Sequence, residues 1–102
     1  MEVLLTGNRF SAEEAYRIGL INYVLPRDQL IPKSEDLAAT IAGNGPIAVR
    51  KIKEALIRCS GLPPEQAFKI ENQFSREVIS TEDAKEGPRA FMEKRKPQYQ
   101  SK

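Results

Sequence analysis

The sequence contains no histidine and no tryptophan, and Cys59 is its only cysteine. Without histidine, imidazole bases, triads of the Ser-His-Asp type and histidine-ligated zinc sites are excluded. A single cysteine allows neither an internal disulfide nor a cluster of thiolate ligands. Any acid or base in this chain is therefore a carboxylate, a lysine, a tyrosine or Cys59, and no metal site is expected.

A long apolar run and a surplus of one charge are also missing. No window approaches the roughly 18 apolar residues of a membrane-spanning helix, and the first residues lack the basic region and apolar run of a signal peptide. Sixteen lysines and arginines stand against fourteen acidic residues, a net charge of +2, and the charges are interspersed. These absences argue against membrane and nucleic-acid partners and predict a soluble protein of the cytoplasm or an organelle matrix.

The length of 102 residues, with 40% hydrophobic and 29% charged residues, fits one small globular domain over residues 1–102. A domain this short buries a smaller share of its surface than a long one. Apolar surface left over after folding is then a plausible docking surface, so contacts with a partner are expected.

Capping residues mark the first helices. Ser11 and Glu14 have the spacing of a capping box that opens a helix over residues 12–18. Gly19 provides its left-handed end. Residues 20–25 are rich in β-prone types and precede a proline, so an extended path is expected there.

Three amphipathic helices are expected in the middle of the chain. Asp28 is predicted to cap the first, and Pro46 and Pro64 suit the first turn of the next two. Apolar residues recur at helical spacing in each of them. The stripes are Leu30, Ser34, Leu37 and Ile41, then Val49, Ile52, Leu56 and Cys59, then Ala67, Ile70, Phe74 and Val78. The chain is thus predicted to be mainly α-helical, with at most one short extended segment.

A last helix is expected after a cap at Ser80 or Thr81. Gly87 and Pro88 are expected to interrupt or kink it before a helical pattern resumes. The polar tail over residues 96–102 is predicted to fray.

The charged clusters have structural interpretations. The acidic pairs at residues 13–14 and 82–83 suit the positive ends of helices better than paired acid–base chemistry. The basic cluster in the helical segment that begins at Pro46 is interpreted as a solvated face, with phosphate contact as the alternative. It consists of Arg50, Lys51, Lys53 and Arg58. Cys59 lies on an apolar stripe and is interpreted as a structural thiol.

Several motifs together resemble one known family. The run LLTGNRFSAEEA at residues 4–15, followed by GLINYVLP at residues 19–26, resembles the segment after the catalytic core of enoyl-CoA hydratases and isomerases, the crotonase family. The turn NGPIAV at residues 44–49 is similar to that family's entry into its next helix. STEDAKEG at residues 80–87 and AFMEKR at residues 90–95 resemble its closing signature. The resemblance covers nearly the whole chain and implies the C-terminal helical region of the crotonase fold.

The resemblance also implies that the chemistry lies elsewhere. In this family an upstream domain of repeated ββα turns supplies two backbone N–H groups as an oxyanion hole and glutamates that move protons. Nothing in this sequence matches either motif, so no catalytic residue is assigned and the chain alone is predicted to be inactive. No cofactor is expected, because coenzyme A enters as the thioester substrate of the parent enzyme.

Two residues are assigned to binding through the resemblance. Phe91 and Lys94 match family positions in the last helix that lie against the adenine and phosphate end of coenzyme A, often that of a neighbouring subunit. Their spacing predicts one shared helical face. The alternatives are a core aromatic and a solvated lysine. Pro88 departs from the family pattern, which has an ordinary helical residue there.

Two hypotheses on function follow. In the first, the chain is the oligomerisation and acyl-CoA-covering segment of a protein that reversibly hydrates 2-enoyl-CoA, with isomerase and hydrolase chemistries open because they share this segment. In the second, the chain is a self-associating helical interaction module, a dimer, trimer or larger, without enzymatic activity. A nucleic-acid-binding function is the third and weakest reading, given the small net charge.

Overall fold

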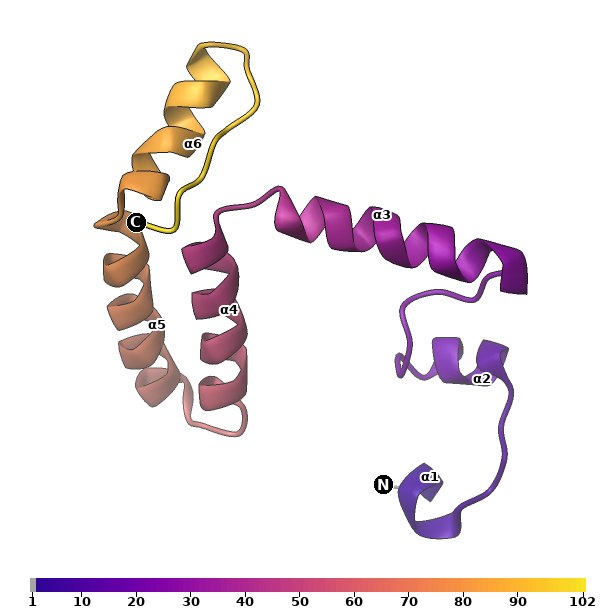
Figure 1. The fold of residues 1–102 in the computed structure, drawn as a ribbon. Coiled ribbons are helices and arrows are strands. Elements are labelled where there is room, and N and C mark those ends of the chain that lie inside the picture. Colours follow the sequence, from indigo (N-terminus) through magenta and orange to yellow (C-terminus); the bar gives the residue numbers. More distant parts are fainter. Residues whose placement is uncertain (1) are drawn as a thin grey trace. The chain divides into compact units, whose positions relative to one another are not determined.

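The computed structural model describes residues 2–102, and Met1 lies outside the described residues. Contacts divide the chain into two compact units, residues 1–35 and 36–102. The regular structure of the described part consists of six α-helices and one 3-10 turn, without a strand (Figure 1). The predicted mainly α-helical fold is confirmed, and residues 20–25 form irregular backbone.

The first unit contains two short helices, α1 (Glu2–Thr6) and α2 (Ala12–Arg17). The hydroxyl of Ser11 accepts a hydrogen bond from the Glu14 N–H at 3.1 Å, which is the predicted cap. Gly19 has a φ of 74° and ends α2 as predicted.

Two local expectations in this unit are wrong. The Glu14 carboxylate pairs with Arg17 at 2.6 Å and does not complete the capping box. Asp28 lies inside a 3-10 turn, Arg27–Gln29, whose N-cap is Pro26, so Asp28 is not a cap. In the first case the Arg17 side chain binds the carboxylate that would complete the capping box. In the second, the 3-10 turn includes the residue that the sequence predicts to precede the helix as its cap.

Helix α3 (Leu30–Ala42) contains the boundary between the units. Its predicted apolar stripe includes Leu30, Leu37 and Ile41, and all three side chains are exposed. This stripe therefore contributes apolar surface that the described chain does not cover.

In the second unit, α4 (Pro46–Cys59) and α5 (Pro64–Ile79) pack side by side (Figure 1). Both helices begin at the prolines that the sequence indicates. Gly61, with a φ of 77°, lies in the turn between them, where residues with a Cβ are disfavoured. Phe74 on α5 is buried and forms the centre of this pair.

Helix α6 (Glu82–Met92) begins at Thr81, whose hydroxyl accepts a hydrogen bond from the Ala84 N–H at 3.1 Å. Of the predicted interruption or kink, the interruption is wrong, because α6 continues through Gly87 and Pro88. A residue before proline normally avoids helical angles because its Cβ meets the proline ring. Gly87 has no Cβ, which removes that conflict.

The tail after α6 is not frayed, contrary to the prediction from the sequence. It turns back and runs alongside the helix toward its start (Figure 1). The Asp83 N–H donates to the carbonyl of Lys102 at 3.2 Å, so the far end of the tail reaches the first turn of α6.

Candidate functional site

The two residues assigned to ligand binding lie at the C-terminal end of α6. Phe91 is in the last turn of the helix and its side chain is 85% exposed. In the described chain it is therefore not a core aromatic, and its ring is available to a partner. Ala90, the preceding residue, is buried and anchors this turn.

Lys94 lies beyond the helix in a left-handed turn. Its φ is 53°, an angle that glycine adopts more readily than lysine. The Lys94 N–H donates to the Phe91 carbonyl at 3.2 Å, and the Arg95 N–H to the Ala90 carbonyl at 3.0 Å. These two bonds form a Schellman motif. Phe91 and Lys94 thus lie close along the chain, but the prediction that they share one helical face is wrong, because Lys94 lies beyond the end of α6.

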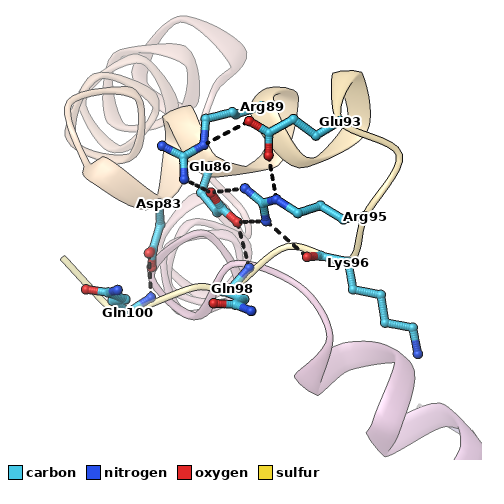
Figure 2. A network of polar contacts seen from close by, with 8 residues as sticks. All are labelled: Asp83, Glu86, Arg89, Glu93, Arg95, Lys96, Gln98 and Gln100. Carbon is cyan, nitrogen blue, oxygen red and sulfur yellow. Dashed lines mark hydrogen bonds and ion pairs between the residues drawn. The ribbon is translucent and has the colours of Figure 1, made fainter.

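A network of charged groups lies between α6 and the tail that follows this turn (Figure 2). The Arg95 guanidinium donates Nη1 and Nη2 to the two oxygens of the Glu86 carboxylate, at 2.5 and 3.0 Å. Its Nε donates to Glu93 at 2.6 Å. Arg89 lies 3.5 Å from Glu86 and 3.7 Å from Glu93. Arg95 is therefore fixed by two carboxylates directly beside Lys94.

Two carboxylates of α6 also bind the backbone of the tail. Glu86 accepts from the Gln98 N–H at 2.8 Å. The buried Asp83 accepts from the Gln100 and Ser101 N–H groups at 2.6 and 2.8 Å. We call Asp83, Glu86 and residues 95–102 the tail clasp. It ties a segment without regular structure to the whole length of α6.

The electrostatics of the clasp follow from these donors. Hydrogen bonds from Arg95 and from the Gln98 N–H lower the pKa of the Glu86 carboxyl from 4.5 to about 2. The same pairing, with a second bond to Glu93, raises the pKa of Arg95. Glu86 therefore remains ionised at neutral pH, and its charge is compensated by cations of its own segment.

The basic cluster on α4 is partly engaged in packing. Lys51 Nζ and the Arg58 guanidinium lie 4.6 and 5.4 Å from the centre of the Phe74 ring. Lys51 pairs with Glu77 at 2.5 Å and Arg58 with Glu54 at 2.6 Å. Hydrogen bonding to Glu77 raises the pKa of Lys51. These two cations stabilise the α4–α5 pair, which argues against a phosphate site there.

An apolar groove lies between α4 and α5. Ile52 and Leu56, from the predicted stripe of α4, are 61% and 71% exposed, and Phe68 on α5 is 61% exposed. The groove encloses about 550 Å³ and is lined mainly by apolar side chains. We call it the α4–α5 groove; its apolar walls come from Ile52, Ala55, Leu56, Cys59, Pro64, Ala67 and Phe68.

The remaining candidates have structural roles. The acidic pairs at residues 13–14 and 82–83 occupy the first turns of α2 and α6, as predicted. Cys59 is a free, half-buried thiol near the Ala67 carbonyl, at 3.6 Å. Within residues 2–102 no group of His, Cys, Asp and Glu side chains could hold a metal ion, and no helix is long and apolar enough to cross a membrane.

The sequence did not indicate the clasp. The sequence pattern indicates only a helix-start role for Asp83, and it indicates no role for Glu86, Arg95 or Tyr99. The bonds join residues nine to eighteen positions apart across an irregular segment. Such pairings have no periodic signal. The only local indication was the position of Asp83 and Glu86, three apart and thus on one face of α6.

Comparison with known proteins gives one consistent family. The family model described as enoyl-CoA hydratase/isomerase matches residues 1–102. The enoyl-CoA hydratase EchA19 of Mycobacterium tuberculosis is 44% identical over 101 residues, which are 99% of this chain and 38% of that protein. The carnitinyl-CoA dehydratase of Proteus mirabilis is 37% identical over 105 residues, covering 99% of this chain and 40% of that protein.

A solved structure agrees with these matches. The crystal structure of enoyl-CoA hydratase from Bacillus anthracis superimposes with a TM-score of 0.94 at 42% identity, covering 99% of this chain and 39% of that one. The chain thus spans about two fifths of the length of the relatives that it matches. Relatives with different printed activities share this segment, so the segment alone does not identify a substrate.

Proposed function

The chain belongs to the enoyl-CoA hydratase/isomerase family, and we propose that it is the C-terminal segment that covers coenzyme A and supplies assembly contacts in a protein of that family. The reaction that we propose for the whole protein is the reversible addition of water across the double bond of a 2-enoyl-CoA. The observation that carries the proposal is the exposed aromatic ring of Phe91 beside Lys94, at the end of α6.

The chemistry of these two side chains suits the adenine and phosphate end of coenzyme A. An exposed aromatic face can stack on a purine, and an ammonium can pair with a phosphate. Phe91 is 85% exposed, so it can reach a ligand without rearrangement of the core. A lysine in a left-handed turn also suggests that its side chain, and not its backbone, explains its presence there.

The assembly role is supported by exposed apolar side chains within the second unit. Ile52, Leu56 and Phe68, which line the α4–α5 groove, are 61%, 71% and 61% exposed. A contiguous apolar groove of this kind is typical of a segment that packs against more protein.

No step of the hydration is assigned to residues of this chain. Polarising a thioester carbonyl requires preorganised N–H donors, and adding water requires a positioned base. The carboxylates with the strongest interactions, Asp83 and Glu86, bind the tail and are not open to a substrate. The catalytic groups therefore belong to the remaining part of the parent protein.

Titration of coenzyme A into the chain, followed by NMR, tests the binding proposal. Phe91→Ala and Lys94→Ala are each expected to weaken binding by about fivefold, because each removes roughly 1 kcal/mol of contact. Met92→Ala and Lys96→Ala are matched controls, since both side chains are exposed and close in sequence. Equal affinity for all four variants and the wild type would contradict the proposal.

The alternative is a self-associating helical module without chemistry, which the exposed α4–α5 groove favours. One simple observation, the reading frame upstream of this segment, distinguishes the two functions. An open reading frame that continues upstream through glycine-rich oxyanion-hole motifs supports the enzyme segment, and a stop codon directly upstream supports the module.

A further inference from the structure

We propose that Asp83, Glu86 and Tyr99 are positioning residues, which hold the end of α6 in place and so direct Phe91 and Lys94 toward their ligand. This inference rests on the proposed coenzyme A function. It assigns a positioning role to Glu86 and Tyr99, which had no role from the sequence, and to Asp83, for which the sequence indicated only a place in the first turn of α6.

The first step is the attachment of the tail to α6. Glu86 receives two bonds from Arg95 and one from the Gln98 N–H, and Asp83 receives one from the Gln100 N–H (Figure 2). Asp83 receives a second bond from the Ser101 N–H. Hydrogen bonds to a carboxylate are about twice as strong as those between neutral groups. The tail is thus held at both its beginning and its end.

The second step is the connection to α4. Tyr99 lies against two glycines from different helical segments. A Cβ built on Gly87 of α6 would be 3.3 Å from the Tyr99 hydroxyl oxygen, and one built on Gly45, just before α4, would be 3.7 Å from the Tyr99 ring. A Cβ at Gly87 would crowd the Tyr99 hydroxyl, whereas one at Gly45 would only be in ordinary van der Waals contact with the ring. Tyr99 therefore links α6 to the start of α4.

The third step connects the clasp to the ligand contacts. Phe91 and Lys94 stand between the body of α6 and Arg95, whose guanidinium is fixed by Glu86 and Glu93. The left-handed angle at Lys94 is unfavourable for a residue with a Cβ. A fixed Arg95 on its far side holds the turn in that conformation, and release of the clasp lets the turn relax.

Variants of the 102-residue chain test this inference. Amide hydrogen exchange at Gln98, Gln100 and Ser101 measures the clasp, and titration with coenzyme A measures presentation of the ligand contacts. Glu86→Gln and Asp83→Asn are expected to accelerate exchange at these amides at least tenfold and to weaken coenzyme A binding about fivefold. Glu82→Gln, an exposed carboxylate in the same helix, is the control and should change neither.

A double-mutant cycle separates positioning from general destabilisation. If Glu86 acts through the two ligand contacts, Glu86→Gln weakens binding in the wild-type chain but adds nothing in a Phe91→Ala, Lys94→Ala background. An equal loss in both backgrounds overturns the inference, as does faster exchange with unchanged affinity.

Tyr99 provides a second test in case the carboxylate variants fold poorly. Tyr99→Phe keeps the ring between the glycines and should retain affinity, whereas Tyr99→Ala should lose about as much as Glu86→Gln. Equal affinities for these two variants contradict the role of the ring. Failure of the proposed function gives a different result. In that case Phe91→Ala and Lys94→Ala leave coenzyme A affinity unchanged, while the exchange data still report the tail clasp. The positioning role is then contradicted as well, because it depends on those two contacts.

Discussion

Lys94 has a backbone conformation that suits glycine better than lysine. Its φ of 53° places it at the position after a helix end where glycine is common. Such a residue is maintained either by neighbouring interactions or by a need for its side chain. Here the neighbour Arg95 is held by two carboxylates, and the side chain is our candidate for a phosphate contact, so stability and function make separable demands on one residue.

The variant Lys94→Gly tests this separation. Relief of the left-handed strain is expected to increase the free energy of unfolding by about 0.5–1 kcal/mol, measured by urea denaturation. Coenzyme A affinity is expected to fall as in Lys94→Ala, which removes the ammonium without relieving the backbone. A stabilised variant that keeps full affinity would remove Lys94 from the proposed contact.

At the scale of elements, α6 and the tail form one unit whose stability depends on a carboxylate. The pKa of Glu86 is lowered from 4.5 to about 2 by Arg95 and the Gln98 N–H. A carboxyl with a lowered folded-state pKa stabilises the fold above its unfolded pKa, and this contribution is lost as the pH falls toward the folded pKa. The relevant window therefore extends from about pH 4.5 down to about pH 2.

Thermal unfolding across this window gives the corresponding prediction. The melting temperature of the wild type should fall more steeply on acidification from pH 4.5 to pH 2.5 than that of Glu86→Gln, whose amide does not titrate. Glu13, Glu14 and Glu77 also have lowered pKa values and contribute to both curves. The difference between the curves isolates Glu86, and parallel curves would contradict its role in the fold.

Elements governed by near neighbours were predictable from the sequence. Gly19, Pro64 and Thr81 act within a few residues, and the structure has each in its expected role. The wrong predictions concern places where a neighbouring residue changes a local preference, or where the interacting residues lie far apart in the sequence. Gly87 makes room for Pro88 inside α6, and the tail is ordered by carboxylates that lie far from it in sequence. Neither effect has a periodic pattern.

The candidate site was predictable only in part. Resemblance indicated Phe91 and Lys94, and the structure adds their exposure and the turn that separates them. The supporting residues Asp83, Glu86 and Tyr99 were not predictable, because most of their partners are backbone groups and glycines, and the one side-chain partner, Arg95, lies nine residues from Glu86. A backbone N–H belongs to every residue type except proline, so the sequence contains no mark of such a bond.

At the scale of the whole molecule, the exposed apolar surface predicts self-association of the isolated chain. Light scattering should find a dimer or larger species. Leu56→Glu, in the α4–α5 groove, should weaken association at least about tenfold, because a charge replaces an apolar contact. Lys53→Gln changes the net charge by the same amount at an exposed position of α4 and should leave association unchanged. A monomer at high concentration would contradict the prediction.

The isolated chain is also expected to lack the reaction proposed for the parent protein. Incubation with crotonyl-CoA, followed by the absorbance of the enoyl thioester, should show no hydration above buffer. The reason is the missing oxyanion hole and base. Turnover that scales with protein concentration would mean that catalytic groups are present in this segment.

The tail clasp determines which positions of the tail can accept substitutions. Its carboxylates accept from main-chain amides, so the identity of the side chains at Gln98, Gln100 and Ser101 matters little to the attachment. Any amino acid except proline supplies the same donor at these positions. A saturation library should therefore tolerate broad variation at Gln98 and Gln100 and little at Asp83, Glu86 and Arg95, which makes positions 98 and 100 convenient places for a spectroscopic label.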